Sequence, residues 1–143
     1  WRLGLAALAR RLPSDEAYDW LERLKVRRRD AEAIAAAITV GPRLVERLRE
    51  ATDPAEVVAI ADRYAPDAPL VALALGDLPQ LHAYFERLRG VRLEVSGADL
   101  AELGLEESPR VGEVLAELRR RKLNGELDGR DSELAAAKEL IAR

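Results

Sequence analysis

SGADLAELGLEESPRVGEVLAEL, residues 96–118, predicts two helices joined by a tight bend. Gly97 opens the first helix, and Gly104 lies where a left-handed C-terminal cap belongs. Ser108 and Pro109 then restart the chain as the N-cap and the first helical residue. A bend of this kind can point the amides at the end of a helix toward a phosphate group.

Helical periodicity extends along most of the chain. Apolar residues repeat at spacings of three and four, as in Ala31, Ile34, Ala35 and Ile38, and each such stripe predicts a helix with one buried face. The pair Gly41-Pro42 predicts a break between two helices. We therefore expect an all-α fold, an array of about nine or ten short helices, at residues 3–11, 15–25, 29–39, 43–51, 54–65, 68–75, 78–89, 98–103, 109–123 and 132–142.

The segment from Val91 to Val95 alternates apolar and charged residues, which is the pattern of a β-strand. No second strand is predicted to pair with it, so we expect a linker. The linker divides a larger helical body, residues 1–90, from a smaller helical tail, residues 91–143.

Composition excludes most kinds of active site. The 143 residues fit one domain or two small helical subdomains. The chain has no cysteine and a single histidine, His82, so thiol chemistry and multi-histidine metal sites are excluded, and we predict no catalytic residue and no metal ligand. His82 lies on an apolar helix face, where a histidine at the edge of the core, making a hydrogen bond, is expected.

The first residue of the chain and its hydropathy indicate what kind of protein to expect. With Trp1 at the front and no methionine, we expect a fragment of a longer protein. Charged residues interrupt every apolar stretch, so neither a membrane span nor a secretory leader is predicted, and we expect a cytoplasmic protein.

Charge limits how the chain can meet nucleic acid. Its net charge of −3 argues against indiscriminate binding, which normally needs a basic surplus. Basic residues cluster at Arg27-Arg28-Arg29 and at Arg119-Arg120-Arg121-Lys122. Each cluster is either a phosphate clamp or an ordinary feature: a solvated turn for the first, and cations at a helix C-terminus for the second.

Gly112 and Ala116 lie four residues apart and remove side-chain bulk from one stripe of the predicted helix. Two explanations are open. Either this helix packs closely against a neighbour, or Gly112 lets an RNA backbone approach the first-turn amides, with Arg110 beside them as a counter-charge.

These motifs resemble the C-terminal region of bacterial tRNA nucleotidyltransferases and the related poly(A) polymerases. The similar residues run from Leu93 to Leu115 and include Ser96-Gly97-Ala98-Asp99-Leu100 and Pro109-Arg110-Val111-Gly112. The helical body is similar with less specific residues. Two positions depart from the family pattern: Ala98 replaces a residue that is often basic, and Ser108 replaces a glycine.

The resemblance implies the body and tail of an enzyme that adds CCA, or part of it, to tRNA 3′ ends. Mg²⁺, CTP and ATP would belong to a catalytic head that, with a neck domain, lies outside this chain, so no cofactor and no catalysis are expected in the fragment itself. The tail would grip the tRNA elbow, at the acceptor and T arms, through backbone shape. The implied RNA-binding residues are Gly97, Arg110, Gly112, Arg119 and Arg120, with Asp99 organising the first helix without touching RNA.

Two other functions stay open at this stage. The chain could be a helical protein-interaction or structural module without RNA binding, which its acidity favours. The bend could also be a helix-hairpin-helix that binds duplex DNA, which the absence of a basic surplus disfavours.

Overall fold

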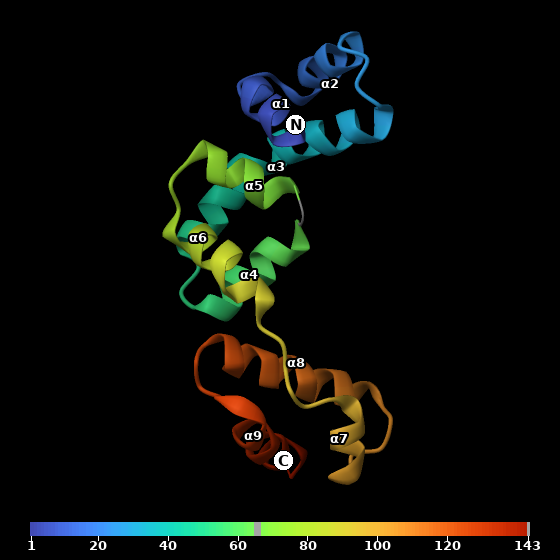
Figure 1. Cartoon of the computed structure of the whole chain (residues 1–143), viewed down its shortest axis with the longest axis vertical. Helices are drawn as coiled ribbons and strands as arrows, with labels where there is room; N and C mark the ends of the chain where they lie inside the picture. Colours follow the sequence, from blue (N-terminus) through green and yellow to red (C-terminus); the bar gives the residue numbers. More distant parts are fainter. Residues whose placement is uncertain (65–66, 143) are drawn as a thin grey trace. The chain divides into compact units, whose positions relative to one another are not determined.

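The computed structural model of the chain describes residues 1–64 and 67–142, apart from the side chains at positions 2, 3, 7 and 14. Throughout this part of the chain every regular element is helical, which confirms the all-α prediction (Figure 1). No helix among these residues combines the length and the apolar character needed to cross a membrane. The elements are α1 (Arg2–Ala9), α2 (Ser14–Arg23), α3 (Arg28–Glu50), α4 (Pro54–Arg63), α5 (Asp67–Leu75), α6 (Pro79–Glu86), the 3-10 turn η1 (Leu88–Gly90), α7 (Gly97–Glu102), α8 (Pro109–Leu123) and α9 (Gly129–Ile141).

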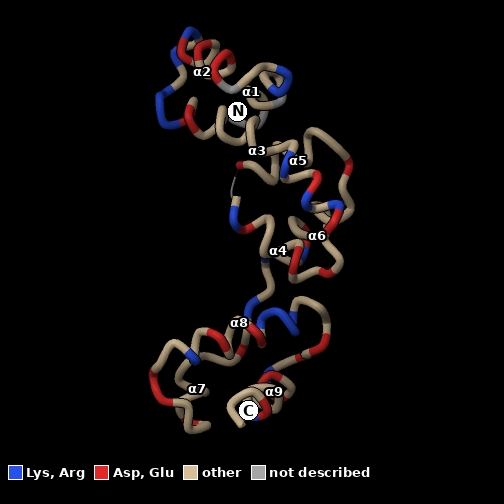
Figure 2. Tube along the Cα trace, turned by 180° about the vertical axis from the view of Figure 1, so that it is seen from behind, with Lys and Arg blue, Asp and Glu red and all other residues tan. Residues whose placement is uncertain are grey.

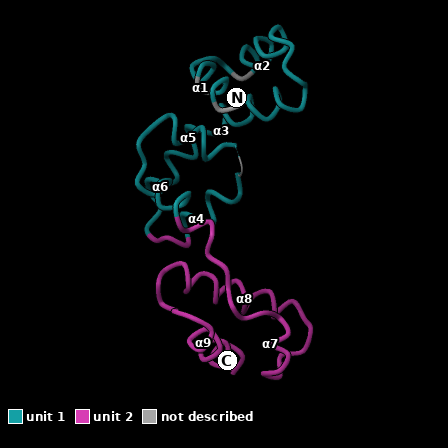
Figure 3. Tube along the Cα trace, viewed as in Figure 1, with its two compact units in different colours: residues 1–52, 56–86 teal, residues 53–55, 87–143 magenta. Residues whose placement is uncertain are grey.

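The chain forms two compact units (Figure 3). Unit 1 contains residues 1–52 and 56–86, and unit 2 contains residues 53–55 and 87–143. The short segment 53–55 belongs to unit 2, where the Asn124 side-chain oxygen accepts a hydrogen bond from the Ala55 N–H at 3.0 Å. The boundary at residue 86 lies a few residues before the linker that the sequence suggests.

Unit 1 is organised around α3, which packs against α1, α2 and α5. The sequence predicts a break at Gly41-Pro42, and this prediction is wrong, because α3 runs without interruption from Arg28 to Glu50. Its buried stripe continues in phase across the pair, from Ile34 and Ile38 through Gly41 to Leu44, Val45 and Leu48. Pro42 has no N–H to donate to the preceding turn, and this loss destabilises the helix. Continuous packing along the buried stripe offsets the loss.

Gly41 serves a contact instead of a turn. A Cβ atom built on Gly41 would lie 3.0 Å from Leu75 Cδ1 and 3.2 Å from Val71 Cγ1, both on α5. Only a residue without a side chain therefore lets α5 approach α3 this closely.

Other predicted helices differ at their ends. The helix predicted to reach residue 89 ends at Glu86 and is followed by η1. The helix predicted over 54–65 is observed as α4 up to Arg63, and its last predicted residue lies outside the described residues.

Unit 2 is built from α7, α8 and α9, with α8 in contact with both other helices. Val95, from the segment that precedes α7, is buried with the helices, so this segment is part of the unit and not a free link. The core is formed by Val95, Leu100, Leu105, Val114, Leu118, Ala136 and Ala137.

The turn after α2 contains a lysine in a left-handed conformation. Lys25 has a φ of 55°. Its N–H donates to the Glu22 carbonyl at 2.8 Å, and the Val26 N–H donates to the Leu21 carbonyl at 3.1 Å. These two bonds form a Schellman motif, whose left-handed position normally carries glycine because a Cβ atom is strained there.

Lys25→Gly is expected to raise the free energy of unfolding by about 0.5–1 kcal/mol, the net of relieving this strain and of the larger entropy of glycine in the unfolded chain. Urea unfolding measures the change. Lys25→Ala is the matched control, because it removes the charge and keeps the Cβ atom. Equal stability of the two variants would contradict a strained backbone at this position.

Candidate nucleic-acid interface

The start of α7 is fixed by Ser96 and Asp99. The Ser96 N–H and hydroxyl both donate to Asp99 Oδ2, at 2.7 and 2.6 Å. Arg130, from α9, donates to the other oxygen, Oδ1. The bonds from Ser96 and from Arg130 hold the pKa of Asp99 well below its usual range. Asp99 therefore organises the first turn of α7 as a carboxylate whose two oxygens are both occupied.

The bend between α7 and α8 follows the predicted caps. Gly104 has a φ of +90°. Its N–H donates to the Ala101 carbonyl at 2.9 Å, and the Leu105 N–H donates to the Leu100 carbonyl at 3.0 Å, so Gly104 is the left-handed residue of a Schellman motif. Pro109 is the first residue of α8, and the side chain of the N-cap residue Ser108 makes no capping hydrogen bond.

A buried carboxylate on α9 holds the segment before α7. Glu133 is fully buried, and its Oε2 accepts hydrogen bonds from the backbone N–H groups of Glu94 and Val95 at 2.8 and 2.9 Å. Its Oε1 receives Lys122 Nζ at 2.5 Å, and Lys122 also donates to Glu94 at 3.2 Å. Burial alone would raise the pKa of Glu133, but these hydrogen bonds outweigh it and lower the pKa.

Sequence reasoning missed Glu133, although a signal existed. Glu133 shares a helical stripe with Ala136, Ala137 and Leu140, at spacings of three, four and seven. A carboxylate inside an apolar stripe indicates a buried charge that needs partners. Its partners, however, are not apparent from any local pattern.

The predicted RNA-binding residues do not form one surface. Gly112, Ala116, Arg119 and Arg120 follow one another at spacings of four, three and one, so they share a face of α8 opposite the buried Val114 and Leu118. We call these four residues the α8 outer face. Figure 2 shows Arg119 to Lys122 as a continuous basic stretch at the end of this helix.

Arg110 lies on another side of α8. At about 100° per residue, its position is about 180° from that of Arg119. Its guanidinium donates to the carbonyls of Leu140 and Ile141, both at 3.3 Å. Arg110 therefore meets the negative end of the α9 dipole, a role that sequence reasoning did not foresee.

Gly112 has no neighbour that explains its lack of a side chain. A Cβ atom built there would meet nothing within 4 Å, and the residue is exposed. Close helix packing, the first of the two explanations from the sequence, is therefore wrong for Gly112. The surface of α8 beside Gly112 is therefore sterically open.

Gly97 lines a hollow of 330 Å³ between α7 and the start of α8. Glu107 also lines this hollow, together with Ala98, Ala101, Leu105 and Val111. A phosphate approaching Gly97 would meet the negative charge of Glu107. Gly97 is thus less favourably placed for an anion than Gly112.

The basic end of α8 carries its own carboxylate. Glu117 accepts two hydrogen bonds from Arg120, at 2.7 and 2.8 Å, and one from Arg121 at 3.0 Å. These bonds lower the pKa of Glu117 to about 2, chiefly through Arg120. Arg120 remains half exposed while Arg121 is largely covered, so Arg120 is the more accessible of the two.

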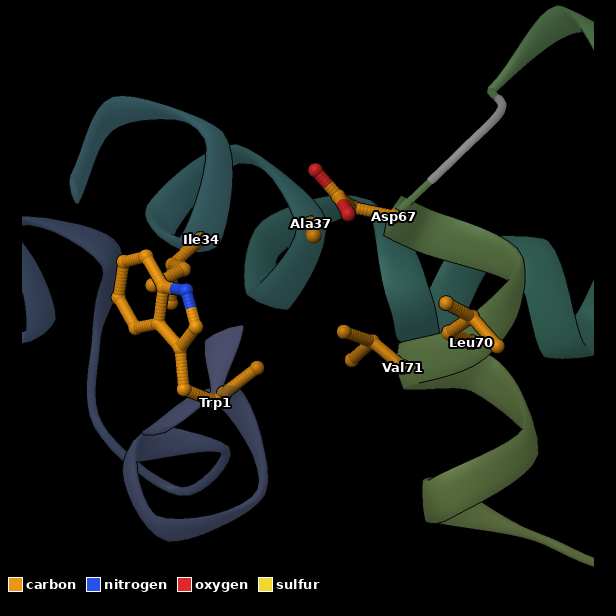
Figure 4. A pocket seen from close by; sticks show the side chains of 7 residues that line it. Trp1, Ile34, Ala37, Asp67, Leu70 and Val71 are labelled. Atoms are coloured by element: carbon orange, nitrogen blue, oxygen red, sulfur yellow. The ribbon is translucent and has the colours of Figure 1, made fainter. Parts of the chain in front are cut away.

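Unit 1 contains a separate apolar cavity of 310 Å³ (Figure 4). Asp67, Leu70 and Val71 of α5 face it from one side, and Trp1 and Ile34 from the other. None of the predicted RNA-binding residues lines this cavity.

The acidic and histidine side chains do not assemble a metal site in the described part of the chain, where no group of three or more has suitable geometry. His82 Nε2 lies 2.8 Å from Asp77 Oδ1, so the expected hydrogen bond is present. The ring is exposed, however, because the buried side of α6 is formed by Leu81 and Tyr84.

A curated protein resembles the chain along nearly its whole length. The chain is 27% identical over 147 aligned residues to the A-adding tRNA nucleotidyltransferase of Geobacter sulfurreducens. The match covers 96% of this chain and 17% of that protein, so the chain spans a small part of its relative's length. No family model and no solved structure matches the chain. The relative, at modest identity, comes from the same family that the sequence motifs resemble.

Glu133→Gln is expected to lower the free energy of unfolding by about 2–3 kcal/mol, because an amide can accept from the backbone but meets Lys122 with a second donor. The folded-state pKa of Glu133 is depressed, so its contribution is complete above its unfolded pKa, near 4.5, and is lost as the pH falls through the folded value. Urea unfolding at pH 7 and pH 3 should therefore show that the variant loses more unfolding free energy, relative to the wild type, at pH 7 than at pH 3.

The matched control is Glu139→Gln on the same helix, whose exposed carboxylate lies 3.9 Å from Arg121. Its effect should stay below about 0.5 kcal/mol. Similar stabilities for the two variants would mean that the buried carboxylate does not hold unit 2 together.

Proposed function

We propose that this chain is a non-catalytic RNA-binding portion, C-terminal in its parent, of a protein like the tRNA nucleotidyltransferases and poly(A) polymerases. It grips the tRNA elbow while a catalytic head outside this chain adds CCA or A to the 3′ end with CTP or ATP and Mg²⁺. The observation that carries the proposal is the similarity to an A-adding tRNA nucleotidyltransferase over 96% of the chain.

The α8 outer face supports the same function. Gly112 leaves the surface open near the positive end of the helix, and Arg119 and Arg120 provide cations at the other end of the same face. Such a surface suits the phosphates of a folded RNA, which is recognised by shape more than by sequence. Arg110 donates to the carbonyls at the C-terminus of α9, so we assign it the role of positioning α9 against α8.

The net charge of −3 favours a different function, a helical module that binds another protein. Binding to labelled tRNA, and to a minihelix of its acceptor and T arms, separates the two functions. An elbow-gripping chain binds both RNAs with similar affinity. A protein-interaction module binds neither RNA, even at low salt.

Arg119→Gln/Arg120→Gln is expected to weaken tRNA binding and to make the salt dependence of log K shallower by about 2, one unit for each lost phosphate contact. Fluorescence anisotropy at several salt concentrations measures both quantities. Arg43→Gln/Arg49→Gln is the control, because it removes the same charge from exposed positions on α3. Equal losses for both double variants would contradict a contact on α8.

Glu117→Gln is expected to tighten tRNA binding, because it releases Arg120 from the carboxylate that now holds it. Glu113→Gln, an exposed position on the same helix, removes one negative charge without releasing an arginine. Affinity should therefore increase more for Glu117→Gln than for Glu113→Gln in the same anisotropy assay. Identical gains would show that only net charge matters and that Arg120 does not contact the RNA.

A further inference from the structure

A second concentration of positive charge lies in unit 1, where α2 passes into α3. Five basic residues occur within seven positions, and all five are exposed. Figure 2 shows the chain between the two helices as largely basic. We call this group the α2–α3 corner; it consists of Arg23, Lys25, Arg27, Arg28 and Arg29.

The backbone at this corner is less stable than it could be. Lys25 occupies the left-handed position of a Schellman motif, where glycine would avoid the strain of a Cβ atom. Lysine adds a cation there and relieves no strain. A residue that is unfavourable for folding at a defined backbone outlier points to a role other than stability.

The charges also oppose the helix that follows. Arg27 is the N-cap of α3, and Arg28 and Arg29 are its first two residues. Cations are unfavourable at the positive end of a helix, and the Arg27 side chain makes no capping hydrogen bond. The corner thus departs from two independent preferences, glycine at a left-handed position and no cation at a helix N-terminus. Both departures increase its positive charge.

Acidic residues of α2 and α3 accompany the cations of the corner. Glu32 accepts from Arg28 at 2.9 Å, and both side chains are well exposed. Arg23 donates to the Asp19 backbone carbonyl at 3.4 Å. The half-buried Asp30 is the acidic residue of the first turn of α3.

We propose that the α2–α3 corner binds the phosphodiester backbone of RNA, as a second contact besides the α8 outer face. The inference rests on the proposed function in one respect, that RNA is the ligand of this chain. Arginine favours this partner because its planar guanidinium binds two phosphate oxygens at once. None of the five corner residues is aromatic, and Tyr18, which interacts with Arg28, is half-buried, so the corner contacts backbone and does not select sequence.

The test measures the whole chain against labelled tRNA by anisotropy at several salt concentrations. Arg27→Gln/Arg29→Gln is expected to weaken binding on the order of tenfold at low salt and to make the salt slope shallower by about 2. Arg43→Gln/Arg49→Gln, on the same helix and with the same loss of charge, should weaken binding far less. Circular dichroism and unfolding midpoints verify that all variants are folded.

Lys25→Gly gives a sharper criterion, because its two effects have opposite signs. The variant should unfold at higher urea concentration than the wild type, and it should bind tRNA more weakly, with a salt slope shallower by about 1. Loss of binding in a more stable protein cannot be attributed to unfolding. Unchanged affinity in Lys25→Gly together with control-like affinity in Arg27→Gln/Arg29→Gln would overturn the proposal.

The design separates this inference from the proposed function. If the corner variants behave like the control while Arg119→Gln/Arg120→Gln loses affinity, the corner contact is wrong and the α8 contact stands. If only the corner variants lose affinity, the corner contact stands and the α8 contact is wrong. If the wild-type chain binds no tRNA at low salt, RNA binding fails at both places.

Discussion

Unit 2 depends on one buried carboxylate. Glu133 would be costly to bury alone, because an unpaired charge loses its hydration without compensation. Its two oxygens instead receive the backbone N–H groups of Glu94 and Val95 and the ammonium of Lys122. The backbone contacts attach the extended segment before α7 to α9. Lys122 lies at the end of α8, so its bond to Glu133 attaches that end to α9 as well. A single side chain thereby joins three parts of the unit.

This arrangement determines which face of α8 is left for a ligand. Val114 and Leu118 are buried in the core, and Lys122 is committed to Glu133. The opposite face keeps Gly112 without a packing neighbour and carries Arg119 and Arg120. The chain is acidic overall, so contact with a polyanion must be local, and its strength should fall with salt in proportion to the few phosphates contacted.

Features set by neighbouring residues were predictable from the sequence, and features set by distant ones were not. The all-α fold, the left-handed Gly104 and the helix start at Pro109 follow from periodicity and local capping. The continuity of α3 through Pro42 depends on packing with α5, and the pairing of Glu133 with Glu94 spans 39 positions. Arg110 illustrates the same limit, because its guanidinium donates to carbonyls 30 and 31 residues away, a contact that no local pattern indicates.

The central claim is that the exposed side of α8 contacts the tRNA elbow. The most direct measurement is a ¹H–¹⁵N NMR titration of the chain with the minihelix of the acceptor and T arms. The account predicts that the amide of Gly112, whose surroundings are open, and those of Arg119 and Arg120 shift in proportion to bound RNA. Saturable binding with no shift at any of these three amides would contradict it.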